Sequence, residues 1–118
     1  MMKRVVKEYN EKFRALADSG RYDGRDDFTV VYQPYMEDAP LPIKADGKPD
    51  MTFVAPDCFH FSSRGHESIA LAMWNNMLEP VGKKTKAALV TSDMYCPTKE
   101  HPYIFTKQNS ITPDQGEL

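Results

Sequence analysis

The chain has 118 residues, 41% of them hydrophobic and 27% charged, with 15 basic and 17 acidic side chains. This length supports one domain with its own core but not two, and the composition argues against wholesale disorder. No basic stripe interleaved with aromatic residues is present, which argues against a nucleic-acid partner, and no apolar run is long enough to span a bilayer. The first residues turn charged again after two apolar positions, which does not fit a signal-peptide core. Taken alone, these features predict a soluble cytoplasmic protein.

Residues 3–18 are predicted to form an amphipathic helix. Apolar side chains recur three to four positions apart with charged residues between them, namely Val5, Val6, Tyr9, Phe13, Leu16 and Ala17. The helix is expected to stop at Ser19 and Gly20, because glycine adopts the left-handed cap conformation at little cost. A polar connector, residues 21–27, follows.

Residues 28–33 are predicted to form a β-strand that ends before Pro34. The segment is rich in β-branched and aromatic residues, and its near-continuous apolar character suits a strand buried on both faces. A helix, a short polar turn and a buried strand make half of an α/β unit. One strong strand cannot make a sheet, so either the chain is a piece of something larger or its partner strands come from elsewhere.

The rest of the chain alternates irregular and regular segments. Residues 34–50 contain Pro34, Pro40, Pro42, Pro49 and Gly47 and are expected to form a long loop, with a brief extended piece at residues 51–54. A mostly apolar helix should then begin at a cap supplied by Ser62 or Ser63, stop at Pro80, and be wedged against other elements. Residues 83–86 are expected to be solvated, and the tail is turn-rich.

Asp57, three residues before His60, is the candidate for chemistry. A carboxylate at this spacing can hold an imidazole in one tautomer and stabilise its charged form, as the acid does in a nucleophile–His–acid triad. No serine of the chain lies in a Gly-Asp-Ser or Gly-x-Ser-x-Gly setting, so the nucleophile is missing. The alternative is an aspartate turn that caps the next helix beside a structural histidine, and such caps are commoner than catalytic dyads.

The cysteines leave two states open. Cys58 and Cys96 either form a disulfide that ties the tail to the candidate site or remain two free thiols. A zinc site would enlist Cys58, His60, His66 and Cys96, with His101 as a further candidate, but the paired spacing that metal sites favour is absent. We therefore expect no metal ion and no cofactor. His66 is expected to be structural, and Gly65 to allow a close backbone approach to a neighbouring loop.

The chain resembles the C-terminal part of a catalytic repeat of the membrane-associated phospholipase B family, within the GDSL, or SGNH, lipases and esterases. The resemblance runs through about residues 5–110. Its most specific part is Asp-Cys-Phe-His-Phe-Ser at 57–62 in register with Trp-Asn-Asn-Met-Leu-Glu-Pro at 74–80. The other blocks that carry it are residues 19–22, 27–34, 55–56, 64–66, 72–73 and 81–82.

The resemblance implies an α/β fold, namely an incomplete three-layer α/β/α, flavodoxin-like SGNH hydrolase fold with few strands. Residues 1–95 would form the C-terminal portion of the hydrolase domain, and residues 96–118 a turn-rich, partly ordered tail. His60 would be the general base toward a serine and then the general acid toward the leaving alcohol, while Asp57 would orient it. The Gly-Asp-Ser block and both oxyanion-hole blocks have no match here and lie upstream of residue 1 in such enzymes.

The implied function is the C-terminal part of a serine ester hydrolase acting on phospholipids or acylglycerols. Its implied partners are the missing N-terminal part of the domain and a membrane surface reached through the parent protein. The alternative is a truncated, non-catalytic remnant or an interaction module, and the isolated chain is expected to be inactive. The resemblance also implies a secreted protein or one on the extracellular side of the plasma membrane, which favours a disulfide between Cys58 and Cys96. With no signal peptide or transmembrane segment in the chain, localisation would depend on the parent protein.

Overall fold

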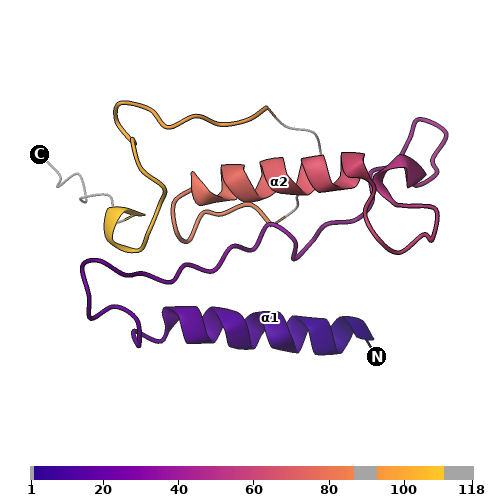
Figure 1. The fold of residues 1–118 in the computed structure, drawn as a ribbon. Helices are drawn as coiled ribbons and strands as arrows, with labels where there is room; N and C mark the ends of the chain where they lie inside the picture. The colour runs from indigo at the N-terminus through magenta and orange to yellow at the C-terminus, as the bar shows by residue number, and fades with distance from the viewer. Residues whose placement is uncertain (1, 87–92, 111–118) are drawn as a thin grey trace, which may run out of the picture.

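The computed structural model describes residues 2–86 and 93–110. Within these ranges it contains two α-helices, α1 (Met2–Asp18) and α2 (Ser63–Met77), and two short 3-10 helices, η1 (Met51–Phe53) and η2 (Gln108–Ser110). Figure 1 shows α1 and α2 as two rods with extended chain running between and around them. Of the described hydrophobic side chains, those that are buried are Ala17, Phe53 and Phe105. The core formed by these segments is therefore small.

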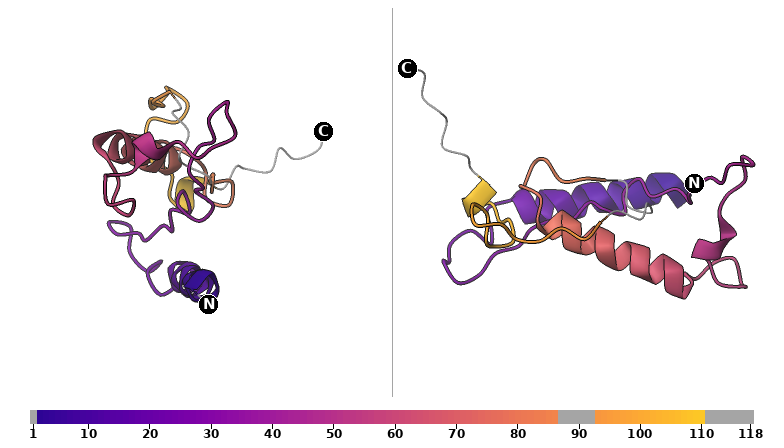
Figure 2. Two further views of the ribbon diagram at one scale, coloured as in Figure 1. Left: turned by 90° about the vertical axis from the view of Figure 1, so that its right-hand side faces the viewer. Right: turned by 90° about the horizontal axis from the view of Figure 1, so that it is seen from above.

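The first predicted helix is confirmed as α1. Both the backbone N–H and the hydroxyl of Ser19 donate to the carbonyl of Leu16, and Gly20 follows with φ of 78°. The helix therefore ends where the sequence predicts. Its apolar face is largely open to solvent, with Tyr9 60% and Phe13 59% exposed, and Figure 2 shows α1 at the periphery of the molecule.

The predicted strand at residues 28–33 is not formed among the described residues. The segment runs extended between the two helices (Figure 1), but it forms no backbone ladder with residues 2–86 or 93–110. The prediction that this segment is buried on both faces is also wrong, since Phe28 is 52% exposed. The pairings that the described residues do form are two isolated antiparallel bridges, Ile43 with Pro49 and Val54 with Phe61. The expected α/β layers are therefore not formed within this part of the chain.

The N-cap of the second helix is Ser62, which resolves the choice between two candidate caps. The Ser62 hydroxyl accepts from the N–H of Gly65, and α2 ends at Met77 with Leu78 as its C-cap. The expected burial of its apolar side chains is wrong, because Met73 and Trp74 are 44% and 36% exposed. The buried residues of α2 are instead small or polar, namely Gly65, Ser68, Asn75 and Asn76.

Polar contacts explain this inverted burial. The side-chain amide of Asn76 donates to Glu79 and to the carbonyl of Thr85, both at 2.9 Å. Lys84 donates to the carbonyls of Asn76 and Glu79 at 2.5 and 2.7 Å, so residues 83–86 are not simply solvated. Burial lowers the pKa of Lys84, and nearby Glu79 partly opposes this shift. The C-terminal end of α2 is thus held by side chains that bond its carbonyls.

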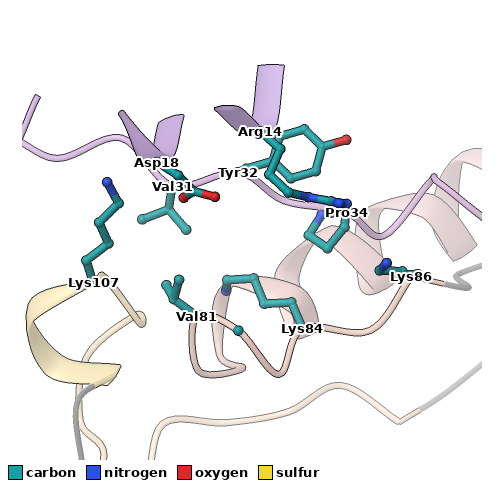
Figure 3. Close-up of a pocket in the computed structure, with 10 residues that line it drawn as sticks. Arg14, Asp18, Val31, Tyr32, Pro34, Val81, Lys84, Lys86 and Lys107 are labelled. Carbon is teal, nitrogen blue, oxygen red and sulfur yellow. The ribbon is translucent and has the colours of Figure 1, made fainter. Parts of the chain in front are cut away.

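Two polar contacts attach α1 to the rest of the molecule. Glu37 pairs with Arg14 of α1 and accepts a 2.8 Å hydrogen bond from the Tyr32 hydroxyl. About one turn further along, at the C-terminal end of the helix, Lys107 donates to the carbonyl of Ala17 at 2.6 Å and pairs with Asp23 at 3.1 Å. Figure 3 shows the cavity of about 300 Å³ between these two contacts, bordered by cationic side chains.

Candidate functional site

The candidate site lies on a tight loop, residues 54–61, at the N-terminal end of α2 (Figure 1). The loop is closed by the bridge between Val54 and Phe61 and by a 2.8 Å hydrogen bond from the N–H of Ala55 to the carbonyl of His60. Cys58 at its tip adopts a left-handed conformation with φ of 57°. This turn reverses the chain so that the residues on either side of Cys58 face each other.

Asp57 and His60, the two predicted site residues, are brought together by this turn. Oδ2 of Asp57 lies 2.6 Å from Nδ1 of His60, and Oδ1 accepts from the N–H groups of Phe59 and His60 at 3.1 and 3.0 Å. One carboxylate oxygen therefore fixes the loop backbone while the other faces the imidazole. Because the N-cap of α2 is Ser62, Asp57 does not cap that helix, and this part of the alternative interpretation is wrong.

The pair is open to solvent. The side chains of His60 and Asp57 are 73% and 51% exposed, and Nε2 of His60 has no hydrogen-bond partner within residues 2–86 and 93–110. The ring of Phe59 lies edge-on to the imidazole with 5.0 Å between centroids, and Phe59 is 79% exposed. A reacting group can therefore approach Nε2 without rearrangement of the loop.

Hydrogen bonding keeps the carboxylate charged. The His60 imidazole and the N–H groups of Phe59 and His60 lower the pKa of Asp57 below its usual value. An ionised carboxylate beside Nδ1 favours the tautomer that carries its proton there, which leaves Nε2 as a proton acceptor. The arrangement can therefore orient a general base and stabilise the imidazolium that forms when the base takes a proton.

The loop is supported by η1 and the first turn of α2. The Ser62 hydroxyl donates to the carbonyl of Thr52 at 2.6 Å, and the Ser62 N–H donates to the carbonyl of Phe53 at 3.1 Å. A Cβ atom on Gly65 would lie 2.2 Å from the Phe53 carbonyl oxygen, which confirms the predicted close approach of backbone at this glycine. The expected extended piece at 51–54 is η1 instead, followed by the bridge residue Val54.

Sequence reasoning missed a further support, the side chain of Arg64. Its guanidinium lies over the Phe53 ring, 4.4 Å from the centroid, and donates to the Thr52 hydroxyl at 2.6 Å. Asp50 accepts from the N–H and hydroxyl of Thr52 at 3.1 and 2.7 Å. The spacing of Asp50 and Thr52 is a local capping signal that points to this turn, whereas nothing local links Arg64 to it.

The expected disulfide is not formed, because Cys58 and Cys96 are both free and exposed. The Tyr95 N–H donates to the side chain of Asn75 at 2.8 Å, which fixes the neighbouring Cys96 near the C-terminal end of α2. Cys58 lies beyond the opposite end of that helix, about 20 Å away at 1.5 Å per residue. The residues of the zinc alternative are not gathered either: in the part of the chain that the structure describes, no group of three or more potential ligands is placed to hold a metal ion.

Among the described residues, no helix has both the length and the apolar character needed to cross a lipid bilayer.

The chain belongs to the GDSL-like lipase/acylhydrolase family, whose model matches residues 1–73. The matched region contains α1, the extended segment, the Asp57–His60 loop and most of α2. The family implies an α/β fold of the SGNH type.

Within that family, the chain is similar to membrane-associated phospholipase B1 of several mammals. It is 49% identical to the human protein over 107 residues, which are 89% of this chain and 7% of that protein. It is 46% identical to the rat protein and 45% to the mouse protein, each over 106 residues, 88% of this chain and 7% of the relative. The chain thus spans about 7% of the length of these curated relatives. No solved structure matches it.

The family and its relatives confirm the resemblance drawn from the sequence blocks.

Proposed function

We propose that Asp57 and His60 are the acid and base of a Ser-His-Asp triad in an enzyme that hydrolyses phospholipid or acylglycerol esters. The observation that carries the proposal is the 2.6 Å contact between Oδ2 of Asp57 and Nδ1 of His60, with the other ring nitrogen open to solvent. Family membership supports ester hydrolysis, and the relatives' name, phospholipase B1, supports the substrate class. The nucleophilic serine and the oxyanion donors would come from polypeptide outside this chain.

In the proposed reaction, Nε2 of His60 takes the proton of the serine hydroxyl as that oxygen attacks the ester carbonyl. It then returns the proton to the departing alcohol, and the sequence repeats with water as the nucleophile. Asp57 stays ionised throughout, which its hydrogen bonds favour by lowering its pKa. The charge of Asp57 stabilises the imidazolium. Its hydrogen bonds to the loop backbone fix the carboxylate, which limits rotation of the His60 ring.

The proposal extends to the architecture around the pair. Residues 1–95 would be the C-terminal portion of a three-layer α/β/α, flavodoxin-like domain, and residues 96–118 a tail beyond it. The serine-bearing remainder of the domain would be the partner of this chain. The relatives are described as membrane-associated, which supports a substrate held at a membrane surface and a secreted or extracellular location.

The test uses a chimera in which this chain replaces the matching stretch of human phospholipase B1. We expect His60→Ala to lower kcat by about 10⁶-fold, because it removes the base, and Asp57→Asn by about 10⁴-fold, because it removes the charge that orients the base. The matched controls are His66→Ala on α2 and Asp46→Asn on the loop, which should leave hydrolysis of a p-nitrophenyl ester near its starting rate. Near-normal rates for both site variants would refute the proposed roles.

The isolated 118-residue chain provides a second measurement. A base and an acid without nucleophile and oxyanion donors lose nearly all triad chemistry, so we expect no turnover of a p-nitrophenyl ester. Hydrolysis that disappears with His60→Ala would instead identify a nucleophile within this chain. That result would overturn the division of the triad between two parts of a longer polypeptide.

A further inference from the structure

We infer that Phe59 is a substrate-contacting residue that selects for an apolar chain on the alcohol side of the ester. The inference deepens the proposed function and rests on it, because it takes His60 as the base that serves the departing alcohol. Three observations carry it: the exposure of the Phe59 ring, the contact of that ring with the imidazole, and the hydrogen bonds that fix the Phe59 backbone.

The two aromatic residues that flank His60 have different surroundings. Phe61 packs against the start of α2, where its ring lies 6.0 Å from the ring of His66 and its side chain lies 3.1 Å from the position of a Cβ atom on Gly65. Phe59 is 79% exposed, and its ring lies 5.0 Å from the His60 imidazole between centroids. Packing on α2 therefore explains an aromatic side chain at Phe61 but not at Phe59.

The backbone of Phe59 is fixed by the same carboxylate that orients His60. The Phe59 N–H donates to Oδ1 of Asp57 at 3.1 Å, and the His60 N–H donates to the same oxygen at 3.0 Å. The preceding residue, Cys58, has the left-handed φ of 57° that turns the chain toward this oxygen. The loop thus sets the position of the Phe59 ring relative to the imidazole before any ligand binds, which lowers the entropic cost of a contact with the ring.

The proposed reaction places the departing alcohol beside this ring. Nε2 of His60 must come within about 2.6–3.2 Å of the alcohol oxygen in order to protonate it. The alcohol carbon is bonded directly to that oxygen, whereas the first carbon of the acyl chain is separated from it by the carbonyl carbon. Because the Phe59 ring borders the same imidazole, with an interplanar angle of 82°, it lies closer to the alcohol side of the ester than to the acyl side.

The chemistry of the ring selects an apolar group on that side. Both oxygens of Asp57 are already engaged, Oδ2 by the imidazole and Oδ1 by two N–H groups, whereas the Phe59 ring presents open hydrocarbon. Covering the ring with an apolar chain removes both from water, which is favourable. Diacyl phospholipids, diacylglycerols and triacylglycerols carry a second acyl chain on the departing alcohol, but a lysophospholipid carries a polar head group there. We therefore expect Phe59 to favour lipids with more than one chain.

Two series of soluble esters test which side of the ester the ring contacts. In the chimera with human phospholipase B1, ethyl, butyl and hexyl butanoate vary the alcohol, while ethyl butanoate, hexanoate and octanoate vary the acyl chain. The alcohols are all primary alkanols of similar reactivity. We expect kcat/KM to rise about 10-fold from ethyl to hexyl butanoate, and Phe59→Ala to reduce this rise to about 2-fold. The rise along the acyl series should change by less than about 2-fold.

Two further variants are the controls. Phe59→Leu keeps a large apolar side chain and should retain most of the rise along the alcohol series. Tyr103→Ala removes a side chain that is 74% exposed near the opposite end of α2, where the Phe105 N–H donates to the carbonyl of Met77, and should leave both series unchanged. Each rise is a ratio measured on one preparation, so a loss of folded chimera lowers all rates equally and leaves the ratio unaltered.

Two results would overturn the inference. An alcohol series that is unchanged by Phe59→Ala would assign the ring to a contact with the rest of the domain. A change confined to the acyl series would place the ring on the other side of the ester. If the chimera hydrolyses none of the esters, the same two series on human phospholipase B1, with alanine at the residue that aligns with Phe59, decide between these outcomes.

His60→Ala in the same chimera separates the contact from the proposed catalytic role. Loss of hydrolysis in His60→Ala, together with an unchanged alcohol series in Phe59→Ala, would refute the contact and leave the role of His60 standing. Near-normal hydrolysis in His60→Ala would refute that role and, with it, the placement of the departing alcohol beside the ring.

Discussion

The Asp57–His60 loop with its supports, residues 50–66, and the region formed by α1 and residues 28–33 differ in what they need from the rest of a protein. In the first region, η1, the loop and the start of α2 satisfy one another through short-range hydrogen bonds and one close backbone approach. In the second, apolar rings face solvent and extended backbone has no described partner. The geometry of the acid–base pair is thus a local property, whereas the layer beside α1 requires residues from elsewhere. A substitution of a given size should therefore lower the free energy of unfolding more in the first region than in the second.

Gly65→Ala should have the largest effect on stability. Its Cβ would meet the Phe53 carbonyl oxygen at 2.2 Å, so η1 and α2 must separate. We expect a loss of about 2–3 kcal/mol in the free energy of unfolding, measured by urea denaturation. Gly24→Ala is the control, because a Cβ there meets nothing within 4 Å. Equal effects of the two substitutions would show that the close approach is absent in solution.

Ser62→Ala tests the cap that lies between the loop and α2. The substitution removes the acceptor for the Gly65 N–H and the donor to the Thr52 carbonyl. We expect a loss of about 1 kcal/mol in the same denaturation experiment. Ser63→Ala, one residue further into the helix, should change the free energy of unfolding by less than about half of that. A larger loss for Ser63→Ala would transfer the cap to that residue.

Tyr32 reports on the contact between residues 28–33 and Glu37. Burial and the hydrogen bond to Glu37 raise the pKa of Tyr32 from 10.0 to about 12. Because the folded protein favours the protonated phenol, this stabilisation is fully present below about pH 10 and is lost as the pH rises through about 12. An ultraviolet titration should show one late-ionising phenol, which disappears in Tyr32→Phe and persists in Tyr103→Phe. A late component in the Tyr32→Phe titration would assign the shifted phenol elsewhere.

Phe13→Ala should have the smallest effect. The ring is 59% exposed on the open face of α1, so its removal from the isolated chain should change the free energy of unfolding by less than about 0.5 kcal/mol. The same denaturation experiment on Phe53→Ala, which truncates a side chain that is 2% exposed, should cost several times more. Similar losses for the two variants would remove the contrast between the two regions.

The features that sequence reasoning predicted well are those set by local interactions. The period of Val5, Tyr9 and Phe13 predicts α1, and Gly20 predicts its end, because both depend on neighbours in the chain. The spacing of Asp57 and His60 predicts their contact for the same reason. The family model and the relatives also confirm the resemblance from which the function was predicted.

The features that sequence reasoning missed depend on long-range partners. The apolar pattern of residues 28–33 reports a preference for a strand, but a strand forms only where a second backbone is available. The apolar run in α2 predicted that its apolar side chains would be buried, yet Asn76 is buried instead, where its side-chain N–H groups donate to Glu79 and to the carbonyl of Thr85. No pattern in the sequence shows that Arg64 lies over Phe53, since that contact depends on how η1 folds back. Composition and spacing do not encode these partners.

The contact between Lys107 and Ala17 joins positions that are 90 residues apart. The ammonium group of Lys107 supplies a hydrogen-bond donor and a positive charge at the C-terminal end of α1. It thereby connects this helix to the last described stretch of the chain. A chain that ends before residue 107 would lose this contact while keeping every residue of the loop that carries His60. The segment around Lys107 therefore helps to hold α1 in place. The effect of a tag or truncation near residue 107 should be measured on the stability of α1 as well.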